Sequence, residues 1–252
     1  MNGWLDRLAT PMRRTTRLAW SALSIMLRLR SRGLPVLLTP KDPPNFPSPL
    51  EADNEGLIAI GGDLSPRRLL AAYRMGIFPW FDESTPILWW SPNPRGILEL
   101  DRLHVSRRLE RTMRGGGFRI TFNKAFAEVI VGCADRIDGT WITPEMQSAY
   151  QKLHRLGHAH SLEVWEDEKL VGGIYGVAQG AFFAGESMFS RKRDASKIAL
   201  VHLARHLRER GFKLFDLQIL NPHTSQFGAE ELPRPEYLRR LHEAVDQLVR
   251  FV

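Results

Sequence analysis

Three short apolar runs in the middle of the chain constrain its fold more than any other feature of the sequence. They cover residues 162–165, 170–177 and 181–189, and only the segments EDEK and AQG separate them. Short runs rich in β-branched and aromatic residues, divided by turn-forming segments, are typical of strands. Connections this short join antiparallel neighbours, whereas a parallel pair needs a long crossover. The sequence therefore predicts an antiparallel meander between Ser161 and Phe189.

A helix and a further buried strand are expected directly after the meander. Residues 194–210 carry leucines on one stripe and charged residues on the opposite face, which is the pattern of an amphipathic helix. Gly211 ends this helix, and residues 212–220 are mostly apolar, as in a buried strand. A meander followed by a helix and a strand indicates an α+β fold in which the last strand pairs beside the meander.

Two further helices are marked by the residues that begin and end them. Each starts with a hydroxyl side chain that can cap the first turn, followed by a proline, and each stops at a glycine. The residues are Ser65, Pro66 and Gly76 in the first helix and Thr143, Pro144 and Gly157 in the second. The proline-rich segment KDPPNFPS, residues 41–48, precedes the first helix and is typical of a linker.

The basic charge of the chain is concentrated at its beginning. Residues 1–40 contain seven arginines and one acid, Asp6, so they carry +6 of the formal net charge of +7. The charge of the remaining chain does not by itself indicate nucleic-acid binding. We expect residues 1–40 to form a basic extension, and three interpretations stay open: an amphipathic helix that contacts a membrane surface or RNA, a disordered tail, and a start codon assigned too early.

Three polar side chains interrupt strands that are otherwise apolar. Asp216 and Gln218 lie in FDLQIL, and Glu186 lies in AFFAGESMF. Side chains alternate between the two faces of a strand, so Asp216 and Gln218 are expected to point the same way. A buried carboxylate is costly unless a partner compensates it. Two interpretations stay open on these residues alone: a structural hydrogen-bond network and a functional site.

Aromatic residues are concentrated in two turn-rich segments, GIFPWF and ILWWSPNPRG. These segments place rings at Phe78, Trp80, Phe81, Trp89 and Trp90. Such rings can stack on a nucleobase or wall a hydrophobic pocket, and packing in the core of a smaller domain is the alternative.

The sequence lacks the usual cofactor and nucleophile motifs. GLIAIGG has no Lys-Ser/Thr pair of a P-loop, and no HExxH, GxSxG or dinucleotide-binding motif occurs. The single Cys133 has no adjacent base and is expected to be a buried structural thiol. His154, His158 and His160 are separated by a helix end, so we expect no metal site there. Any reaction would therefore need a substrate that is already activated.

Five segments of the chain carry a family pattern in order: GLIAIGGDLSPRRLLAAYRMGIFPWF, ILWWSPNPRGIL, GTWIT, LGHAHSLEVWEDEKLVGGIYGVAQGAFFAGESMFSRKRDASKIAL and DLQILNPHTSQFGAEELPRPEYL. Through them, residues 48–241 closely resemble the bacterial leucyl/phenylalanyl-tRNA-protein transferase family. The resemblance implies a smaller N-terminal α/β domain, residues 41–95, and a catalytic C-terminal domain with an acetyltransferase-like (GNAT-like) fold, residues 96–252. This implied fold agrees with the meander, helix and strand.

The resemblance also implies a reaction. Members of this family transfer Leu or Phe from aminoacyl-tRNA to the α-amine of proteins that begin with Arg or Lys, which marks those proteins for N-end-rule degradation. An aminoacyl ester is already reactive, so no ATP, metal or other cofactor is expected. The implied partners are Leu-tRNA, Phe-tRNA and the acceptor protein. The implied enzyme is cytoplasmic and monomeric, with no stable membrane span.

The resemblance assigns roles to residues at matching positions. Asp216 and Gln218 match a catalytic Asp-x-Gln pair, and Glu186 matches a third catalytic residue, near the donor amino acid and the basic acceptor residue. The implied substrate-binding residues are Tyr73, Trp80 and Trp141 around the terminal adenosine and the donor, Phe183 in the wall of the side-chain pocket, and Asn221 at the substrate backbone. The implied tRNA contacts are Ser190, Arg191 and Lys197.

Acid–base chemistry limits the role of Asp216. The ordinary pKa of an aspartate, about 3.9, is far below the value of about 7.7 to 8.0 for an α-ammonium group, and a glutamine amide cannot accept a proton. We therefore favour orientation and electrostatic stabilisation over general-base catalysis for Asp216 and Gln218, with the tRNA ribose as a proton carrier.

Two features depart from the family pattern. Residues 1–40 have no counterpart in it, and Ile174 and Phe215 stand where pocket-lining residues are expected, which would shift the preference among Leu, Phe and Met. Two alternatives stay open. One is an aminoacyl-tRNA-dependent transferase that uses another amine. The other is a catalytically idle tRNA-binding relative, for which loss of a catalytic residue would be expected.

Overall fold

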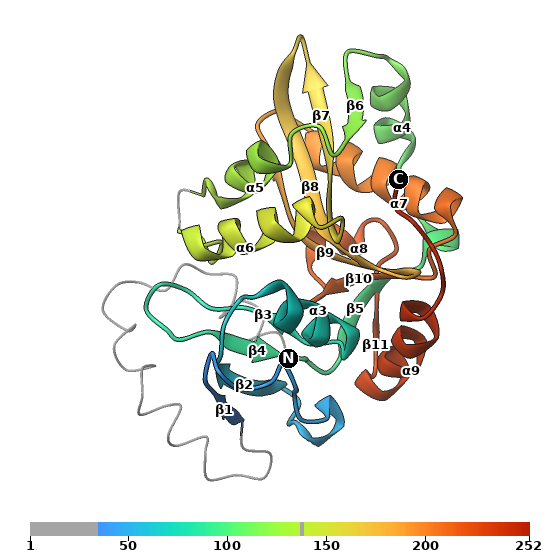
Figure 1. Ribbon diagram of the computed structural model, residues 1–252. Coiled ribbons are helices and arrows are strands. Elements are labelled where there is room, and N and C mark those ends of the chain that lie inside the picture. Colours follow the sequence, from blue (N-terminus) through green and yellow to red (C-terminus); the bar gives the residue numbers. More distant parts are fainter. Residues whose placement is uncertain (1–34, 137–138) are drawn as a thin grey trace.

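The computed structural model describes residues 35–136 and 139–252, which form two β-sheets flanked by helices (Figure 1). This mixture confirms the predicted α+β class. The first sheet has the strand order β1-β2-β4-β3, in which β1 and β2 are parallel and the other pairs are antiparallel. Its strands are β1 (Val36–Leu38), β2 (Leu57–Gly61), β3 (Phe78–Pro79) and β4 (Leu88–Trp90), with helix α3 (Pro66–Arg74) between β2 and β3.

The second sheet has seven strands in the order β11-β5-β10-β9-β8-β7-β6. Strands β9 and β10 run parallel, and the other pairs are antiparallel. The strands are β5 (Arg95–Leu98), β6 (Arg119–Phe122), β7 (Ala159–Glu166), β8 (Lys169–Gln179), β9 (Phe182–Ser190), β10 (Leu214–Gln218) and β11 (Glu230–Leu232). The predicted meander is therefore confirmed as β7, β8 and β9, and the expected last strand, β10, pairs with its edge.

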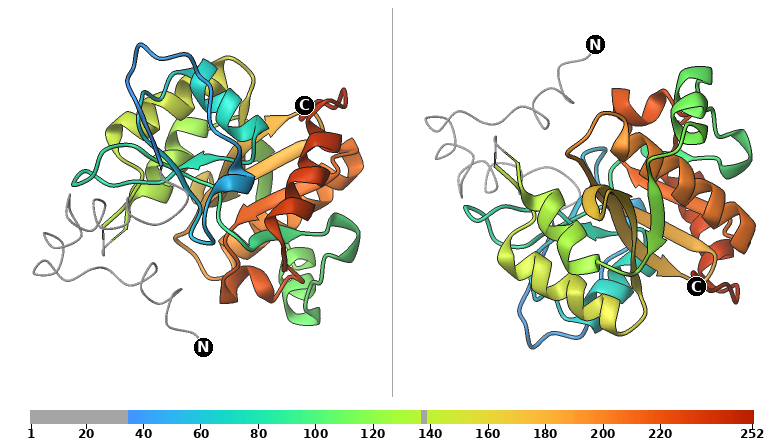
Figure 2. Two further views of the ribbon diagram at one scale, coloured as in Figure 1. Left: turned by 90° about the horizontal axis from the view of Figure 1, so that it is seen from below. Right: turned by 90° about the horizontal axis from the view of Figure 1, so that it is seen from above.

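Helices cover both faces of the second sheet (Figure 2). Side chains of α5 (Phe126–Ala134) and α6 (Pro144–Arg155) share one hydrophobic cluster with Tyr175 of β8, whereas those of α7 (Ala195–Arg210) share another with the adjacent Ile174. Because neighbouring residues of a strand face opposite ways, the two helix layers lie on opposite faces. The remaining helices are α4 (Arg107–Arg114), α8 (Pro222–Ser225) and α9 (Arg234–Val245).

The two helices predicted from their caps begin as expected. The Ser65 hydroxyl accepts a hydrogen bond from the backbone N–H of Arg68 at 3.4 Å, and the Thr143 hydroxyl accepts one from Met146 at 3.2 Å. Each cap satisfies one of the N–H groups that the first helical turn leaves without a partner.

The expected linker, residues 41–48, is held by a side chain of helix α3. The buried guanidinium of Arg68 donates to the backbone carbonyls of Thr39, Asp42 and Pro43, at distances of 3.2, 2.8 and 3.4 Å. The basic extension expected at residues 1–40 lies outside the described residues as far as residue 34, and its last part contains β1.

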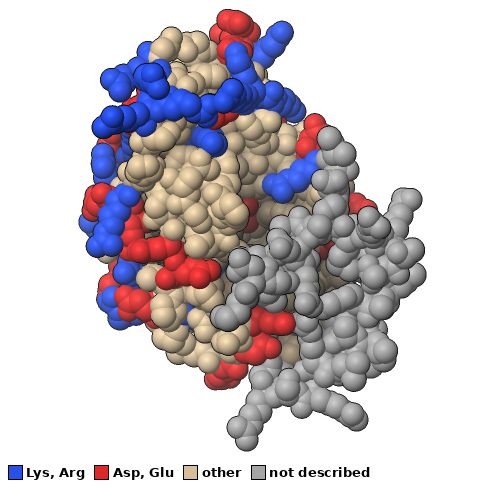
Figure 3. All heavy atoms as spheres, turned by 180° about the vertical axis from the view of Figure 1, so that it is seen from behind, with Lys and Arg blue, Asp and Glu red and all other residues tan. Residues whose placement is uncertain are grey.

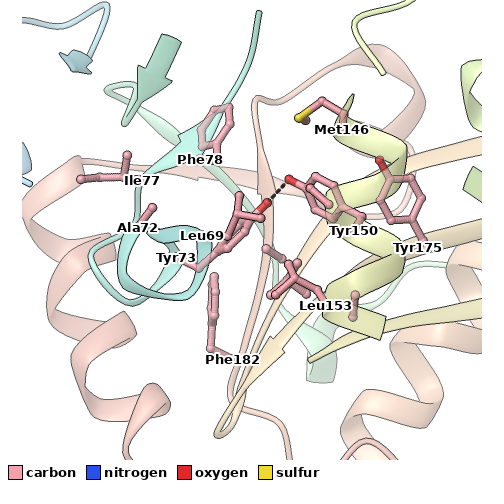
Figure 4. Packing of buried hydrophobic residues seen from close by; sticks show 14 of the residues in the cluster. Leu69, Ala72, Tyr73, Ile77, Phe78, Met146, Tyr150, Leu153, Tyr175 and Phe182 are labelled. Carbon is pink, nitrogen blue, oxygen red and sulfur yellow. Dashed lines mark hydrogen bonds between the residues drawn. The ribbon is translucent and has the colours of Figure 1, made fainter. Parts of the chain in front are cut away.

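One hydrophobic cluster joins the two sheets. It contains Tyr73 of α3 and Trp89 of β4 together with Tyr150 of α6 and Tyr237 of α9 (Figure 4 shows part of this cluster). Of the turn-rich aromatic residues, Phe78, Phe81 and Trp89 are buried in this core, whereas Trp80 and Trp90 are partly exposed. Among the described residues, no helix is both long enough and apolar enough to cross a membrane.

Candidate active site

A cavity of about 240 Å³ lies beside the central strands β9 and β10. Its walls come from β3, from the connection between α5 and α6, from β8 and β9, and from the end of β10 with the start of α8. The polar lining residues are Arg136, Glu186, Ser187, Gln218, Asn221 and Thr224, and the aromatic ones are Phe78, Trp80 and Trp141.

The cavity lies where two neighbouring strands stop pairing. Residues 182–184 of β9 pair with residues 214–216 of β10, but β9 continues to Ser190 without this partner. The lining residues Glu186 and Gln218 both lie beyond the paired segment. The parting of the strands thus places polar side chains from both of them around one space.

A β-bulge re-aims the side chains of β9. Tyr175 of β8 lies opposite Ser187, and Gly176 lies opposite Gly185, so Glu186 is an extra residue in β9. A bulge bends its strand and interrupts the alternation of side chains. Glu186 and its neighbour Ser187 therefore both line the cavity, which regular alternation would not allow.

A second irregularity separates Asp216 from Gln218. The register of β10 against β5 shifts between these residues, and Gln218 has a φ of 58°, which is uncommon for a residue other than glycine. The backbone N–H of Gln218 donates to Oδ1 of Asp216 at 2.9 Å and supports this conformation. The two side chains differ in exposure: Asp216 is fully buried, whereas Gln218 lines the cavity.

Asp216 is compensated by a buried cation. Nε and Nη2 of Arg95 donate to the two carboxylate oxygens at 2.8 and 2.7 Å, and the hydroxyl of Tyr237 donates to Oδ2 at 2.9 Å. Burial alone would lower the pKa of Arg95, but the neighbouring carboxylate raises it instead. Nη1 of Arg95 also donates to the carbonyl of Gly76 at 3.0 Å. Asp216 is thus a carboxylate fixed on both oxygens.

Glu186 is a buried acid with two hydrogen-bond donors. Nε2 of Gln218 donates to Oε1 at 2.9 Å, and the hydroxyl of Tyr150 donates to Oε2 at 3.0 Å. Burial raises the pKa of Glu186 to about 7, although these donors favour the carboxylate. Glu186 therefore changes its protonation state near neutral pH, in contact with the space where a substrate would bind.

Tyr73 supports this arrangement from the other sheet. Its hydroxyl is hydrogen-bonded to that of Tyr150, as the dashed line in Figure 4 shows. Burial raises the pKa values of both phenols, so both stay protonated and able to donate. A continuous network therefore runs from Tyr73 through Tyr150, Glu186 and Gln218 to Asp216.

The structure places most of the predicted catalytic and substrate-binding residues at the cavity and leaves others buried behind its wall. Trp80, Trp141, Glu186, Gln218 and Asn221 line the cavity, whereas Tyr73 and Asp216 are buried behind its wall. Asn221 also caps α8, since its side chain accepts a hydrogen bond from the N–H of Thr224 at 3.0 Å.

Phe183 lies away from the cavity, in the cluster that packs under α7. Its ring stacks on Phe251 and meets the edge of Phe215, with centroid distances of 5.6 and 5.7 Å. Phe215 is likewise fully buried, whereas Ile174 lines the cavity. Phe183 thus occupies a core position and does not contribute to the cavity wall.

The expected tRNA contacts lie at the end of β9 and the start of α7. The Ser190 hydroxyl accepts from the N–H of Ser196 at 3.2 Å and so ties the two elements together. The guanidinium of Arg191 lies over the ring of Phe189, and Nζ of Lys197 lies 3.9 Å from Asp194. Arg191 is exposed and Lys197 half-buried, so both present positive charge near the surface.

Sequence reasoning missed several residues of this region. Arg95, Tyr150 and Tyr237 hold the network, and Arg136 and Ser187 line the cavity. Basic helix α4, RRLERTMR, was also missed, although its exposed arginines could have been noticed as a cluster in the sequence. A band of Lys and Arg crosses the upper part of the molecule in Figure 3, at the end where Figure 1 places α4.

The described residues contain no cluster of His, Cys, Asp and Glu that could hold a metal ion. Cys133 is buried in α5, and burial raises the pKa of its thiol to about 12, which confirms the expected structural role. The groups that face the cavity can donate hydrogen bonds, carry charge and stack on rings.

Comparison with protein families gives two matches. The family described as leucyl/phenylalanyl-tRNA protein transferase matches residues 97–242, and the N-terminal domain of that family matches residues 62–93. Among curated proteins, the leucyl/phenylalanyl-tRNA–protein transferase of Erwinia tasmaniensis is 56% identical over 201 residues, covering 79% of this chain and 87% of that protein. The same enzyme of Anaeromyxobacter sp. strain K is 52% identical over 218 residues, covering 85% and 93%.

Solved structures show weaker likeness. A GCN5-related N-acetyltransferase from Kribbella flavida matches with 13% identity and a TM-score of 0.36, covering 67% of this chain and 61% of that one. The C-terminal domain of a lysylphosphatidylglycerol synthetase from Agrobacterium fabrum, described as putative in its source, matches with 13% identity and a TM-score of 0.41, covering 67% and 64%. Both TM-scores lie below 0.5.

Proposed function

Because the chain belongs to the leucyl/phenylalanyl-tRNA-protein transferase family, it is an aminoacyltransferase, and we propose that it transfers Leu or Phe from tRNA to the α-amine of proteins that begin with Arg or Lys. The observation that carries the proposal is the cavity that Glu186 and Gln218 line together with two tryptophans. Acidic and amide groups suit an amine, and aromatic rings suit a nucleoside.

The reaction needs little covalent help from the protein. The acceptor nitrogen attacks the ester carbonyl, a C–N bond forms, and the bond to the ribose oxygen breaks. The nitrogen loses a proton and the ribose oxygen gains one, so no other reactant is required. Catalysis then consists of holding an amine and an ester together and stabilising the charge that develops.

We assign the donor to the aromatic and apolar lining residues of the cavity. Trp80 and Trp141 would hold the terminal adenosine, and the apolar lining residues Ile174, Met188 and Leu217 would surround a Leu, Phe or Met side chain. Tyr73 would act through Tyr150, because it is buried behind the wall.

We assign the acceptor to Glu186 and Gln218. A carboxylate at Glu186 attracts a basic first residue and an α-ammonium group, and the carbonyl of the Gln218 side chain can accept a hydrogen bond from the amine. Asn221 would contact the substrate backbone. Asp216 orients Gln218, since Arg95 occupies both of its oxygens and leaves it unable to approach the amine.

The body of the tRNA would lie on the basic surface. The proposed contacts are Ser190, Arg191 and Lys197, together with the exposed arginines of α4. Cytoplasmic location, a monomeric enzyme, N-end-rule tagging of the product and a division into domains at residues 41–95 and 96–252 belong to the same proposal.

The test is transfer of labelled Leu from Leu-tRNA to a pair of peptides that differ only in beginning with Arg or Gly, without ATP. The full chain is expected to label the Arg peptide selectively, and a Glu186→Gln variant should lose part of that selectivity because it removes the negative charge. Equal labelling of both peptides would indicate another amine acceptor, and tRNA binding without transfer would indicate the idle relative.

A further inference from the structure

Arg136 is a cation in the cavity wall that the proposed chemistry does not use. It follows α5, and its guanidinium is fixed at two points: Nε donates to the carbonyl of Cys133 at 3.1 Å, and Nη2 donates to the hydroxyl of Ser187 at 2.9 Å. These two bonds hold a normally flexible side chain against the wall that also carries Glu186.

Bonds to the described residues use only part of the donor capacity of the Arg136 guanidinium. An arginine has five N–H groups, and the bonds to Cys133 and Ser187 use two of them. Within residues 35–136 and 139–252, no carboxylate lies within ion-pair distance of Arg136, and no other Lys or Arg lines this cavity. The residue is exposed, so a ligand can reach it.

The two proposed substrates bring opposite charges to this site. The proposed acceptor brings cations, which Glu186 attracts and Arg136 repels. The donor brings anions, because each nucleotide is joined to the strand by a phosphodiester. A planar guanidinium matches phosphate oxygens well, and Trp141, proposed to hold the terminal nucleoside, lines the same cavity.

We propose that Arg136 binds the phosphodiester that joins the last nucleotide of the aminoacyl-tRNA to the rest of the strand, and so positions the ester next to Glu186 and Gln218. This assignment rests on the proposed function and adds to it a contact that distinguishes the donor from the acceptor. Ser187 acts as a positioning residue, because its hydroxyl holds the guanidinium.

The experiment compares two donors that differ in the phosphate: Leu-tRNA and 2′(3′)-O-leucyl-adenosine, which has none. Loss of a hydrogen bond to a charged group should lower kcat/KM by about tenfold to a hundredfold for the tRNA donor in Arg136→Gln. The same variant should stay within about twofold of the wild type with the nucleoside donor. Arg136→Lys, which keeps the charge but not the planar fork, should lose less.

Two further variants control for folding and charge. Arg210→Gln removes an exposed arginine from the far end of α7, and it should match the wild type with both donors. Ser187→Ala keeps the charge of Arg136 but frees its guanidinium, and it should show a smaller loss that is again confined to the tRNA donor. This variant keeps the proposal testable if Arg136→Gln folds poorly.

The outcomes separate the two proposals. An equal loss with both donors would place Arg136 at the reacting carbonyl or in the structure of the wall, and no loss with either donor would remove it from binding; both results overturn the assignment. If the wild-type protein transfers Leu from neither donor, the proposed function itself is wrong, and the assignment of Arg136 falls with it.

Discussion

Asp216 depends on Arg95 more than on any other residue, because both groups are buried and each compensates the charge of the other. Replacing Asp216 by Asn would leave a buried, uncompensated guanidinium. We expect the free energy of unfolding to fall by about 3 to 5 kcal/mol, as for other broken buried ion pairs. Urea denaturation followed by tryptophan fluorescence measures this loss.

A double variant provides the control. Asp216→Asn combined with Arg95→Gln removes both charges, so its loss of stability should be smaller than the sum of the two single losses. Transfer activity should stay low in both, since Gln218 loses the carboxylate that holds its backbone. Near-wild-type turnover of Asp216→Asn would show that this charge is not needed for orientation.

Glu186 gives the protein a pH-dependent stability with a definite sign. Burial raises its pKa from 4.5 to about 7, so the folded protein binds a proton that the unfolded chain has released. Protonation of Glu186 therefore contributes about 3 kcal/mol to the free energy of unfolding. This contribution is fully present below pH 4.5 and is lost as the pH rises through 7.

The measurement is urea unfolding from pH 4.5 to 8 for the wild type and Glu186→Gln. Glutamine keeps the shape of the side chain and cannot titrate, so the stability difference between the two proteins should change across this window. A difference that stays constant with pH would contradict a raised pKa.

For single residues, the sequence indicates which side chains are unusual but not which residues they contact. Asp216, Gln218 and Glu186 were detectable because polar side chains stand out in apolar strands. Arg95 was not, because it lies 121 positions from Asp216 and only the fold brings the two together. The sequence could not decide whether Asp216, Gln218 and Glu186 form a structural network or a functional site. The structure shows one hydrogen-bond network, and its members Glu186 and Gln218 line a cavity.

Among the elements, those with a strong local pattern were the predictable ones. Short apolar runs predicted the meander, and capping residues predicted α3 and α6. Strands β1 and β3 contain only three and two residues, too few for a periodic pattern, and they exist because β2 and β4 pair with them. Bulges were unpredictable for a related reason: they follow from the register of two distant strands, which the sequence of one strand does not contain.

Helix α4 allows a prediction about tRNA binding by a single element. Arg107 and Arg114 are exposed, and we propose that they contact the phosphates of the tRNA body. Replacing both by Gln should weaken tRNA binding at low salt and reduce the slope of log K against log salt by about 2, since each phosphate contact contributes about 0.9 for a duplex. Filter binding at several salt concentrations measures the slope, and Arg210→Gln is the matched control. An unchanged slope would place the tRNA elsewhere.

For the molecule as a whole, the two sheets are joined more closely than a linker between domains would allow. They share one hydrophobic cluster, and buried Arg234 of α9 donates to the backbone carbonyls of Pro49 and Ala52 ahead of β2. The Tyr73–Tyr150 hydrogen bond crosses between the same two parts, directly behind the cavity. Because the candidate active site uses residues from both parts, its geometry depends on their packing as one unit.

The beginning of the folded part gives the last prediction. A form that lacks residues 1–34 keeps β1 and every carbonyl that Arg68 contacts, whereas a form that lacks residues 1–40 loses β1 and the carbonyl of Thr39. We expect the first form to match the full chain in unfolding free energy and in Leu transfer. The second should be less stable by about 2 kcal/mol or more, because buried Arg68 loses one of its three carbonyl acceptors and β2 loses a neighbouring strand. Equal stability of the two shortened forms would show that β1 contributes nothing to the sheet.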